Sequence, residues 1–200
     1  EGMLVEGYDR LSTMALIYNH PYYPEHMKKH GYYKETGWLE YRITIPKQLP
    51  ERHRKIAEAV MERYGLVIKK KTRRDIKKQN YGQKLFKLIN ETYCVLYGYS
   101  LLSEKQIDQY VDVYLSLIDT KMLTFVEDSE GGLIGAGITI PSLSEALQKC
   151  NGEIFPFGWW HLLKTMFIKK PDTLDLLLIG VRPDWQNKGV NSLVFVDLFT

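Results

Sequence analysis

The residues with the clearest chemical meaning follow an apolar run that ends at Val181-Arg182-Pro183. They are Gln186-Asn187-Lys188-Gly189-Val190-Asn191, a polar loop that contains one glycine. After the loop, Leu193, Val194, Val196 and Leu198 recur with helical spacing. Backbone N–H groups at the start of a helix converge on a bound anion, and the helix dipole favours negative charge there. The order of strand, loop and helix therefore predicts a phosphate-binding loop.

Several further elements must position this loop. A strand over 175–181 leads into it, and two β-rich runs at 122–126 and 133–140 are joined by a glycine-containing turn typical of a hairpin. Upstream, the pattern predicts a short strand at 66–68, a helix over about 82–97, and a second helix that begins with a capping box at 103–106. From residue 66 the expected order is strand, two helices, hairpin, helical insertion, strand, loop and helix.

This order and the loop resemble the GNAT superfamily of N-acetyltransferases. The acyl-CoA-binding segment of that family is a strand ending in Val-x-Pro, followed by Gln/Arg-x-x-Gly-x-Gly/Ala. Val181, Pro183, Gln186 and Gly189 match the pattern, whereas Asn191 stands where the second small residue belongs. The resemblance implies an α/β (α+β) acyl-CoA N-acyltransferase fold, with a central mixed, mostly antiparallel sheet flanked by helices. It also implies transfer of an acyl group, expected to be acetyl, from acyl-CoA to an amine of a small-molecule or peptide acceptor.

The same resemblance implies roles for individual residues. Backbone groups of a splayed strand would pair with the pantetheine arm, here those of Leu178, Ile179 and Val181. The loop would hold the pyrophosphate through Gln186, Asn187, Lys188, Gly189, Val190 and Asn191. Asp175, near the start of the signature strand, matches the family's usual catalytic base, and Glu127 on the hairpin is the second candidate. The alternative for Asp175 is a solvated residue at a strand end.

Residues 1–46 resemble the last third of a domain of the same family. Their pattern predicts extended runs at 3–5, 13–18 and 38–45 and a helix at 25–30, and the stretch 22–32 is similar to the family's Tyr-x-x-x-Gly-Phe segment. We therefore expect the end of one GNAT-like domain at 1–46, a linker helix at 47–65, and the first two-thirds of a second such domain at 66–200. The arrangement indicates an internal piece of a bacterial tandem-GNAT protein, with the remainder of that chain as a partner.

Basic residues gather in one part of the chain. The net charge is only +3, but residues 47–78 hold twelve Lys and Arg against four Asp and Glu, a local charge of +8. Segment 69–78 therefore makes a nucleic-acid-associated protein one alternative function. No interleaved aromatic residues accompany these charges, so we favour a solvated face and expect no nucleic acid as a partner. A catalytically silent GNAT-like binding module is the other alternative, and Asn191 favours it.

Composition excludes several other classes of protein. No apolar run approaches the roughly 18–20 residues of a membrane helix, and no signal peptide is visible, so we expect a cytoplasmic protein without a membrane partner. Cys94 and Cys150 lack CxxC spacing, which argues against a disulfide framework or a zinc site. His26 and His30 have the i, i+4 spacing of two metal ligands, but they lack a third, so no metal is expected.

The segment 155–160, Phe-Pro-Phe-Gly-Trp-Trp, is the most distinctive part of the helical insertion. If its aromatic side chains are exposed, they would form an apolar lid or an acceptor pocket for a large substrate. If they fold inward, they are core. The proline and glycine favour a surface loop.

Overall fold

The computed structural model describes residues 2–115, 118–168 and 172–199. The chain divides into two compact units. The first consists of Glu1–Thr44 and Pro141–Asp175, and the second of Ile45–Ile140 and Leu176–Thr200.

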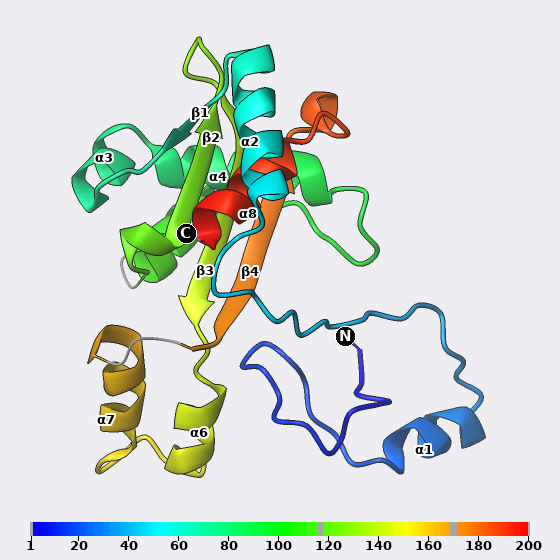
Figure 1. Ribbon diagram of the computed structural model, residues 1–200. Coiled ribbons are helices and arrows are strands. Elements are labelled where there is room, and N and C mark those ends of the chain that lie inside the picture. The colour runs from blue at the N-terminus through cyan, green and yellow to red at the C-terminus, as the bar shows by residue number, and fades with distance from the viewer. Residues whose placement is uncertain (1, 116–117, 169–171, 200) are drawn as a thin grey trace. The chain divides into compact units, whose positions relative to one another are not determined.

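A four-stranded sheet forms the centre of the second unit, and the ends of its last two strands run into the first (Figure 1). The strands lie in the order β1 (Val67–Lys69), β2 (Leu123–Glu127), β3 (Leu133–Pro141) and β4 (Leu174–Val181). β1 and β2 pair antiparallel, as do β2 and β3. β3 and β4 are also antiparallel, since Arg182 N–H donates to Ile134 O at one end of the pair and Ser142 N–H donates to Thr173 O at the other. The predicted α+β class, with a mostly antiparallel sheet flanked by helices, is confirmed.

One face of the sheet is covered by α4 (Tyr81–Tyr93) and α5 (Glu104–Tyr110). α4 buries Leu85 and Leu88 against Phe125 and Ile138 of the strands. α5 begins at the predicted capping box and continues as a π-helical turn, η1 (Val111–Leu115). A short helix that the sequence did not indicate, α3 (Arg73–Lys78), precedes α4, and η2 (Thr120–Met122) precedes β2.

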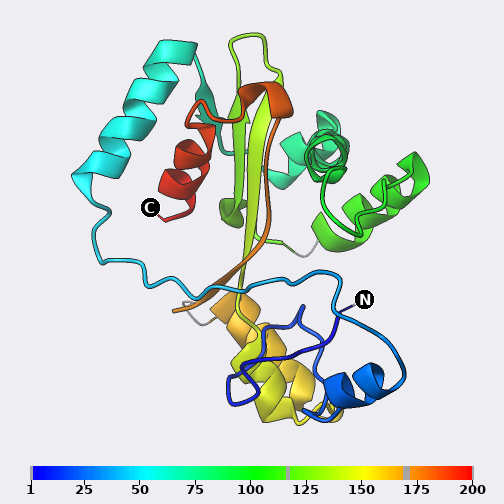
Figure 2. The ribbon, with the colours of Figure 1, turned by 90° about the vertical axis from the view of Figure 1, so that its right-hand side faces the viewer.

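The opposite face is covered by α2 (Glu51–Tyr64) and α8 (Val190–Leu198), and Figure 2 shows the sheet between the two helical layers. Both helices contribute to one buried cluster, which includes Ala57, Val126 and Val194. Two strand glycines permit this contact. A Cβ on Gly137 would lie 2.5 Å from Val194 Cγ1, and one on Gly135 would lie 3.2 Å from a methyl group of the same helix. The glycines of β3 therefore serve close helix packing.

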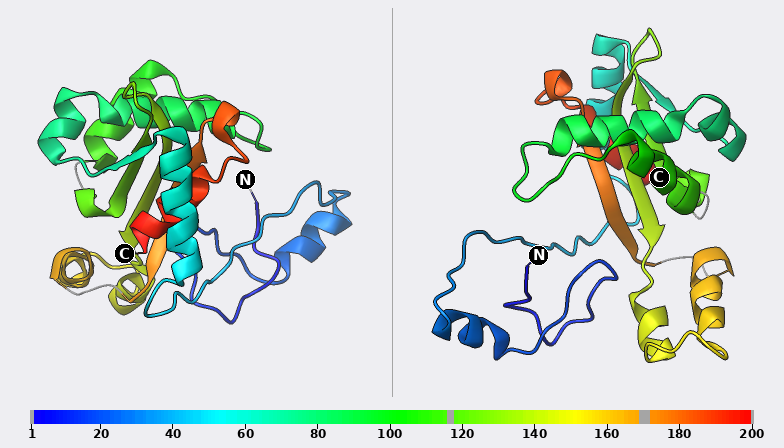
Figure 3. Two further views of the ribbon diagram at one scale, coloured as in Figure 1. Left: turned by 45° about the horizontal axis from the view of Figure 1, so that its top comes forward. Right: turned by 180° about the vertical axis from the view of Figure 1, so that it is seen from behind.

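The first unit is mainly irregular. Its helices are α1 (Tyr23–Lys29), α6 (Ser144–Cys150), α7 (Gly158–Leu163) and the π-helical turn η3 (Lys164–Ile168). α6 and α7 lie side by side as a helical hairpin (Figure 3). The helix expected at 25–30 is confirmed as α1, but the extended runs expected at 3–5, 13–18 and 38–45 form no strand among residues 2–46. A strand requires a paired neighbour, and none lies beside these described residues.

Candidate functional site

The predicted phosphate loop lies at one end of the sheet, between β4 and α8. η4 (Pro183–Trp185) follows the strand, and Gly189 directly precedes the helix with φ +82°. Asn187 has φ +61°, so the backbone takes the left-handed conformation twice within three residues. Ser192 N–H donates to Gly189 O at 3.0 Å, whereas the N–H groups of Val190 and Asn191 have no acceptor within the helix and can bind an anion at this end.

Side chains of the loop close it against its own backbone. Gln186 Nε2 donates to Val181 O at 3.1 Å, which joins the loop to the end of β4. Ser192 Oγ donates to Gly189 O at 2.6 Å and fixes the first turn of the helix. Gln186 therefore shapes the loop through its side chain, while its backbone N–H donates to Pro183 O at 3.3 Å.

Two cationic side chains near the loop differ in availability. Arg182 donates from Nε and Nη2 to the Asp184 carboxylate at 2.7 and 2.9 Å, and this pairing holds the Asp184 pKa below its usual value. Lys188 forms no ion pair at contact distance among the described residues, although its charge also helps to lower the Asp184 pKa. Its Nζ lies 4.7 Å from the Trp185 ring centroid and 5.9 Å from that of Tyr64, a cation–π arrangement on an exposed side chain. Lys188 therefore supplies the positive charge that an anion at the loop would meet.

Gly189, Val190 and Asn191 contribute in different ways. Gly189 is required by its positive φ, and also because a Cβ there would lie 3.0 Å from Val60 Cγ2 of α2. Val190 is 1% exposed, so its side chain belongs to the core and only its N–H is available to a ligand. Asn191 is exposed at the second position of α8, where an added amide meets solvent.

The strand residues predicted to meet pantetheine have half-buried side chains. Leu178 packs with the cluster under α4, whereas Ile179 and Val181 pack with the cluster under α2 and α8. The backbone of Ile179 is bonded to a side chain from another element. Tyr93 Oη, at the end of α4, donates to Ile179 O at 3.0 Å and accepts from Ile179 N–H at 3.3 Å. A ligand that pairs with Ile179 must replace this hydroxyl.

Glu127 lies at the loop end of the sheet but is buried. Glu127 of β2 is in register with Leu133 of β3, and the next residue, Ile134, accepts a backbone hydrogen bond from Arg182. Two strand spacings therefore separate Glu127 from Arg182, a distance of roughly 10 Å. Only 5% of Glu127 is exposed. Its Oε1 accepts from Tyr81 Oη and lies 3.4 Å from Lys71 Nζ.

The pKa values of Tyr81 and Lys71 are both raised beside Glu127. Burial raises the pKa of Tyr81, and the hydrogen bond to Glu127 raises it further. For Lys71, burial favours a lower pKa, but the contact with Tyr81 and the attraction of Glu127 outweigh it and the pKa is raised. Lys71 Nζ also lies 4.3 Å from the Tyr81 ring centroid. The three groups form a satisfied buried cluster, so a proton-accepting role for Glu127 requires that cluster to open.

Asp175 is the second residue of β4 and is half-buried. It belongs to the first unit, and the strand carries it about 20 Å from Val181. The structure thus gathers Val181, the loop and Glu127 at one end of the sheet and leaves Asp175 at the other end of the strand. Its role as a base stays a prediction.

The basic segment 69–78 is partly engaged in structure. Lys70 Nζ pairs with Asp197 Oδ2 of α8 at 2.6 Å, and Lys71 belongs to the buried cluster of Glu127. Thr72 and Asp75 form a capping box at the start of α3. The basic residues of α3, which are Arg73, Arg74, Lys77 and Lys78, are exposed. The segment is therefore a solvated basic face in which two lysines, Lys70 and Lys71, make structural ion pairs.

Within the described ranges, no group of three or more His, Cys, Asp or Glu side chains is placed to hold a metal ion. The helices of the described chain include none with the length and apolar character needed to cross a bilayer. Cys94 and Cys150 are both free thiols.

Comparison with known proteins gives two distant relatives, and no family model matches the chain. It is 23% identical over 199 residues to Protein YghO of Escherichia coli (strain K12), an alignment that covers 96% of this chain and 48% of the relative. It is 24% identical over 191 residues to a bacterial ceramide synthase of Caulobacter vibrioides (strain NA1000 / CB15N), with 92% and 47% covered. The chain therefore spans about half the length of the curated relatives it matches, and is distantly homologous to both.

Proposed function

We propose that this chain is the acyl-CoA-binding part of a GNAT-type N-acyltransferase. The observation that carries the proposal is the passage from β4 through the loop into α8. There Gly189 in the left-handed conformation, the open N–H groups of the helix start and Lys188 form an anion-binding end. The pyrophosphate of acyl-CoA has the matching charge. The order of strands and helices in the second unit supports the same assignment.

The distant likeness to a ceramide synthase supports an amine as the acceptor. Ceramide is an N-acylated sphingoid base, so its synthesis forms an amide bond. In the proposed reaction the amine nitrogen attacks the thioester carbonyl, the C–S bond breaks, and CoA leaves as the thiol. The acceptor ammonium first loses one proton to a base, for which Asp175 and Glu127 are the candidates, so that the neutral amine is the nucleophile. After the attack the nitrogen loses a second proton, which balances the one taken up by the departing sulfur.

A charge change at the helix start tests the binding step. Asn191→Asp alters the side chain by almost no volume and adds a negative charge where the phosphates would lie. The acid is compatible with the helix dipole, so α8 should fold normally. We expect acetyl-CoA and longer acyl-CoA to stabilise the parent chain in a thermal-shift assay, and Asn191→Asp to weaken that binding about fivefold or more through like-charge repulsion.

Asn151→Asp is the matched control, because it adds the same charge at an exposed turn of the first unit. It should leave acyl-CoA binding unchanged. Thiol release with a panel of amines then measures turnover. If no acyl-CoA stabilises the parent chain, or if both variants bind alike, the loop is not a phosphate site and the proposal is wrong.

A catalytically silent acyl-CoA-binding module is the second candidate. It is favoured by one observation, the engagement of Glu127 with Lys71 and Tyr81. Acyl-CoA stabilisation without thiol release from any amine would support the silent module, and amine-dependent thiol release would exclude it.

A further inference from the structure

We propose that the aromatic segment, residues 154–168, docks on the surface of an anionic phospholipid bilayer. The segment joins α6 to α7 and continues through η3. Its three phenylalanines and two tryptophans, Phe155, Phe157, Trp159, Trp160 and Phe167, are all exposed, and Phe155 and Phe157 are 79% and 75% exposed. Exposed apolar surface of this density marks an interaction site.

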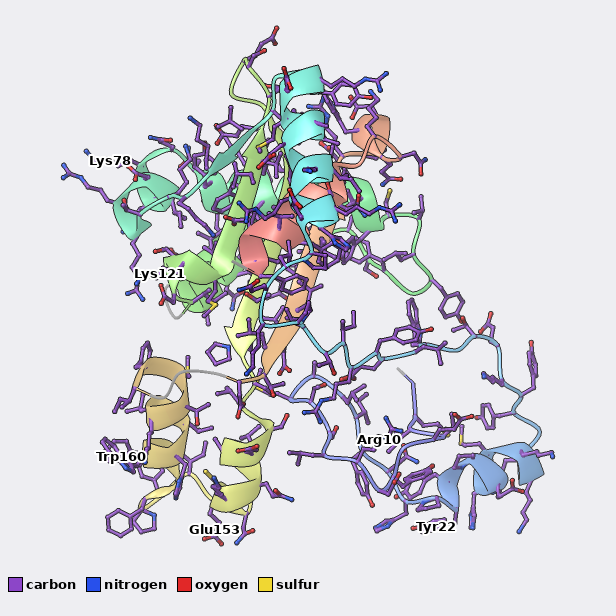
Figure 4. The ribbon with its side chains drawn as sticks, in the orientation of Figure 1. Arg10, Tyr22, Lys78, Lys121, Glu153 and Trp160 are labelled. Carbon is purple, nitrogen blue, oxygen red and sulfur yellow. The ribbon has the colours of Figure 1, made fainter. Side chains whose placement is uncertain are left out.

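The backbone of the segment is closely packed at Gly158. A Cβ on Gly158 would meet Glu153 O at 1.9 Å, so only glycine allows the tight approach that turns the chain into α7. Cys150 Sγ donates to Gly158 O at 3.0 Å and joins the two helices. The buried residues of α6 are Ser144, Ala146 and Cys150. Figure 4 shows Trp160 on the side of α7 that faces away from α6.

Charge distinguishes a lipid surface from a protein partner. The segment contains one lysine, Lys164, and no acidic residue, and two more lysines, Lys169 and Lys170, follow it directly in the sequence. Protein interfaces are enriched in aromatic residues but depleted of lysine, whereas interfacial helices on membranes combine Trp and Phe with Lys. The indole N–H of Trp159 already donates to Pro156 O at 2.8 Å, so its ring can leave water without losing a hydrogen bond.

Surface docking needs no spanning helix. The expectation that no membrane is a partner rested on the lack of a long apolar run, and a segment lying in the headgroup region requires only one apolar face. The inference also stands apart from acyl transfer, because a chain without affinity for acyl-CoA can still bind a bilayer through these rings. If both proposals hold, the segment would bring the enzyme to amphiphilic amines that reside in membranes.

Vesicle partitioning of the protein as it occurs in the cell tests the inference. The probes are vesicles of phosphatidylcholine and phosphatidylglycerol at 3:1, and vesicles of phosphatidylcholine alone. The double variant Phe155→Ser/Phe157→Ser removes two highly exposed rings and should weaken partitioning to the anionic vesicles by about tenfold or more. Val95→Ser, at an 84% exposed apolar site of the second unit, is the matched control and should bind as the parent does.

Fluorescence reports whether the segment itself enters the lipid. These 200 residues contain four tryptophans, so replacing Trp38, Trp185 and every tryptophan elsewhere in the full protein with Phe leaves Trp159 and Trp160 as emitters. Their emission should shift to the blue on anionic vesicles and be quenched by brominated lipid. Equal partitioning of the double serine variant and the parent overturns the inference. Emission that brominated lipid does not quench also overturns the inference. It would mean that the rings do not enter the lipid and are covered by another part of the protein or by a protein partner. Acyl-CoA stabilisation should not change in the serine variant, which separates this test from that of the proposed function.

Discussion

Replacing Tyr93 with phenylalanine tests whether the edge of β4 receives a ligand at Ile179. The Tyr93 hydroxyl makes two hydrogen bonds to that residue, at 3.0 and 3.3 Å. Phenylalanine removes both and keeps the ring, which packs edge-on against Tyr99 at 5.7 Å. Ile179 would then present a free N–H and a free carbonyl to solvent.

The expected change in affinity follows from the free energy that these two hydrogen bonds contribute. A neutral hydrogen bond contributes about 0.5–1.5 kcal/mol net, so the half-exposed pair should stabilise the native chain by roughly 1–2 kcal/mol. If the amides of the pantetheine arm pair with Ile179, the ligand must displace the hydroxyl in the parent chain and lose that energy. In the Tyr93→Phe variant no displacement is needed, and acyl-CoA should bind about five- to thirty-fold more tightly.

Isothermal titration with acetyl-CoA measures the change, and urea unfolding of the free chain measures the stability lost. Tyr99→Phe is the control, because its hydroxyl donates to Asn90 Oδ1 at 2.7 Å and does not touch β4. Tyr99→Phe should leave the affinity unchanged. An affinity of Tyr93→Phe equal to or weaker than that of the parent would refute the reasoning, since the ligand would then pair elsewhere or bind to the hydroxyl itself.

Three further predictions concern packing, ionisation and the loop. Gly137→Ala places a methyl group 2.5 Å from Val194 Cγ1 and should lower the free energy of unfolding by about 1–3 kcal/mol in urea titration; an unchanged midpoint would contradict the close contact of α8 with the sheet. Because burial and Glu127 raise the Tyr81 pKa, its stabilising contribution is complete below the ordinary tyrosine pKa of about 10 and is lost as pH rises through the raised value. The melting temperature of Tyr81→Phe should therefore decline less than that of the parent above about pH 10, and parallel declines would contradict the shift. Gly189→Ala forces a side chain into the left-handed region and should cost about 1–2 kcal/mol in thermal unfolding, whereas a neutral effect would show that the loop relaxes freely.

Local patterns predicted most of the second unit. The capping box at Ser103, the turn between β2 and β3, and the apolar run of β4 each depend on residues close together in sequence, and each element forms where its pattern lies. The helix α3 was missed because the basic segment that contains it was interpreted only as a solvated, charged face. Its signal was the capping box of Thr72 and Asp75.

Longer-range features could not be predicted from the same patterns. The contact of Tyr93 with Ile179 joins residues 86 positions apart, and neither residue carries a local sign of the other. The burial of Glu127 depends on two neighbours that the fold supplies, Lys71 and Tyr81. The run at 38–45 alternates as a strand does, yet alternation cannot provide a partner strand. The exposure of the aromatic segment was likewise open, since helical spacing suits a core and a surface equally.

The short edge strand β1 is secured from both sides of the sheet by consecutive lysines at its end. Lys70 reaches Asp197 of α8, while Lys71 reaches Glu127 of β2. The first contact joins residues 127 positions apart in sequence, and such non-local contacts form late because a long loop must close first. During synthesis, β1 can therefore pair with β2 and gain its Glu127 contact before α8 has left the ribosome. The Lys70–Asp197 ion pair that completes the contacts of β1 can form only when α8 packs on the sheet. The same packing step places the start of α8 at the anion-binding end, so the two features form in one folding event.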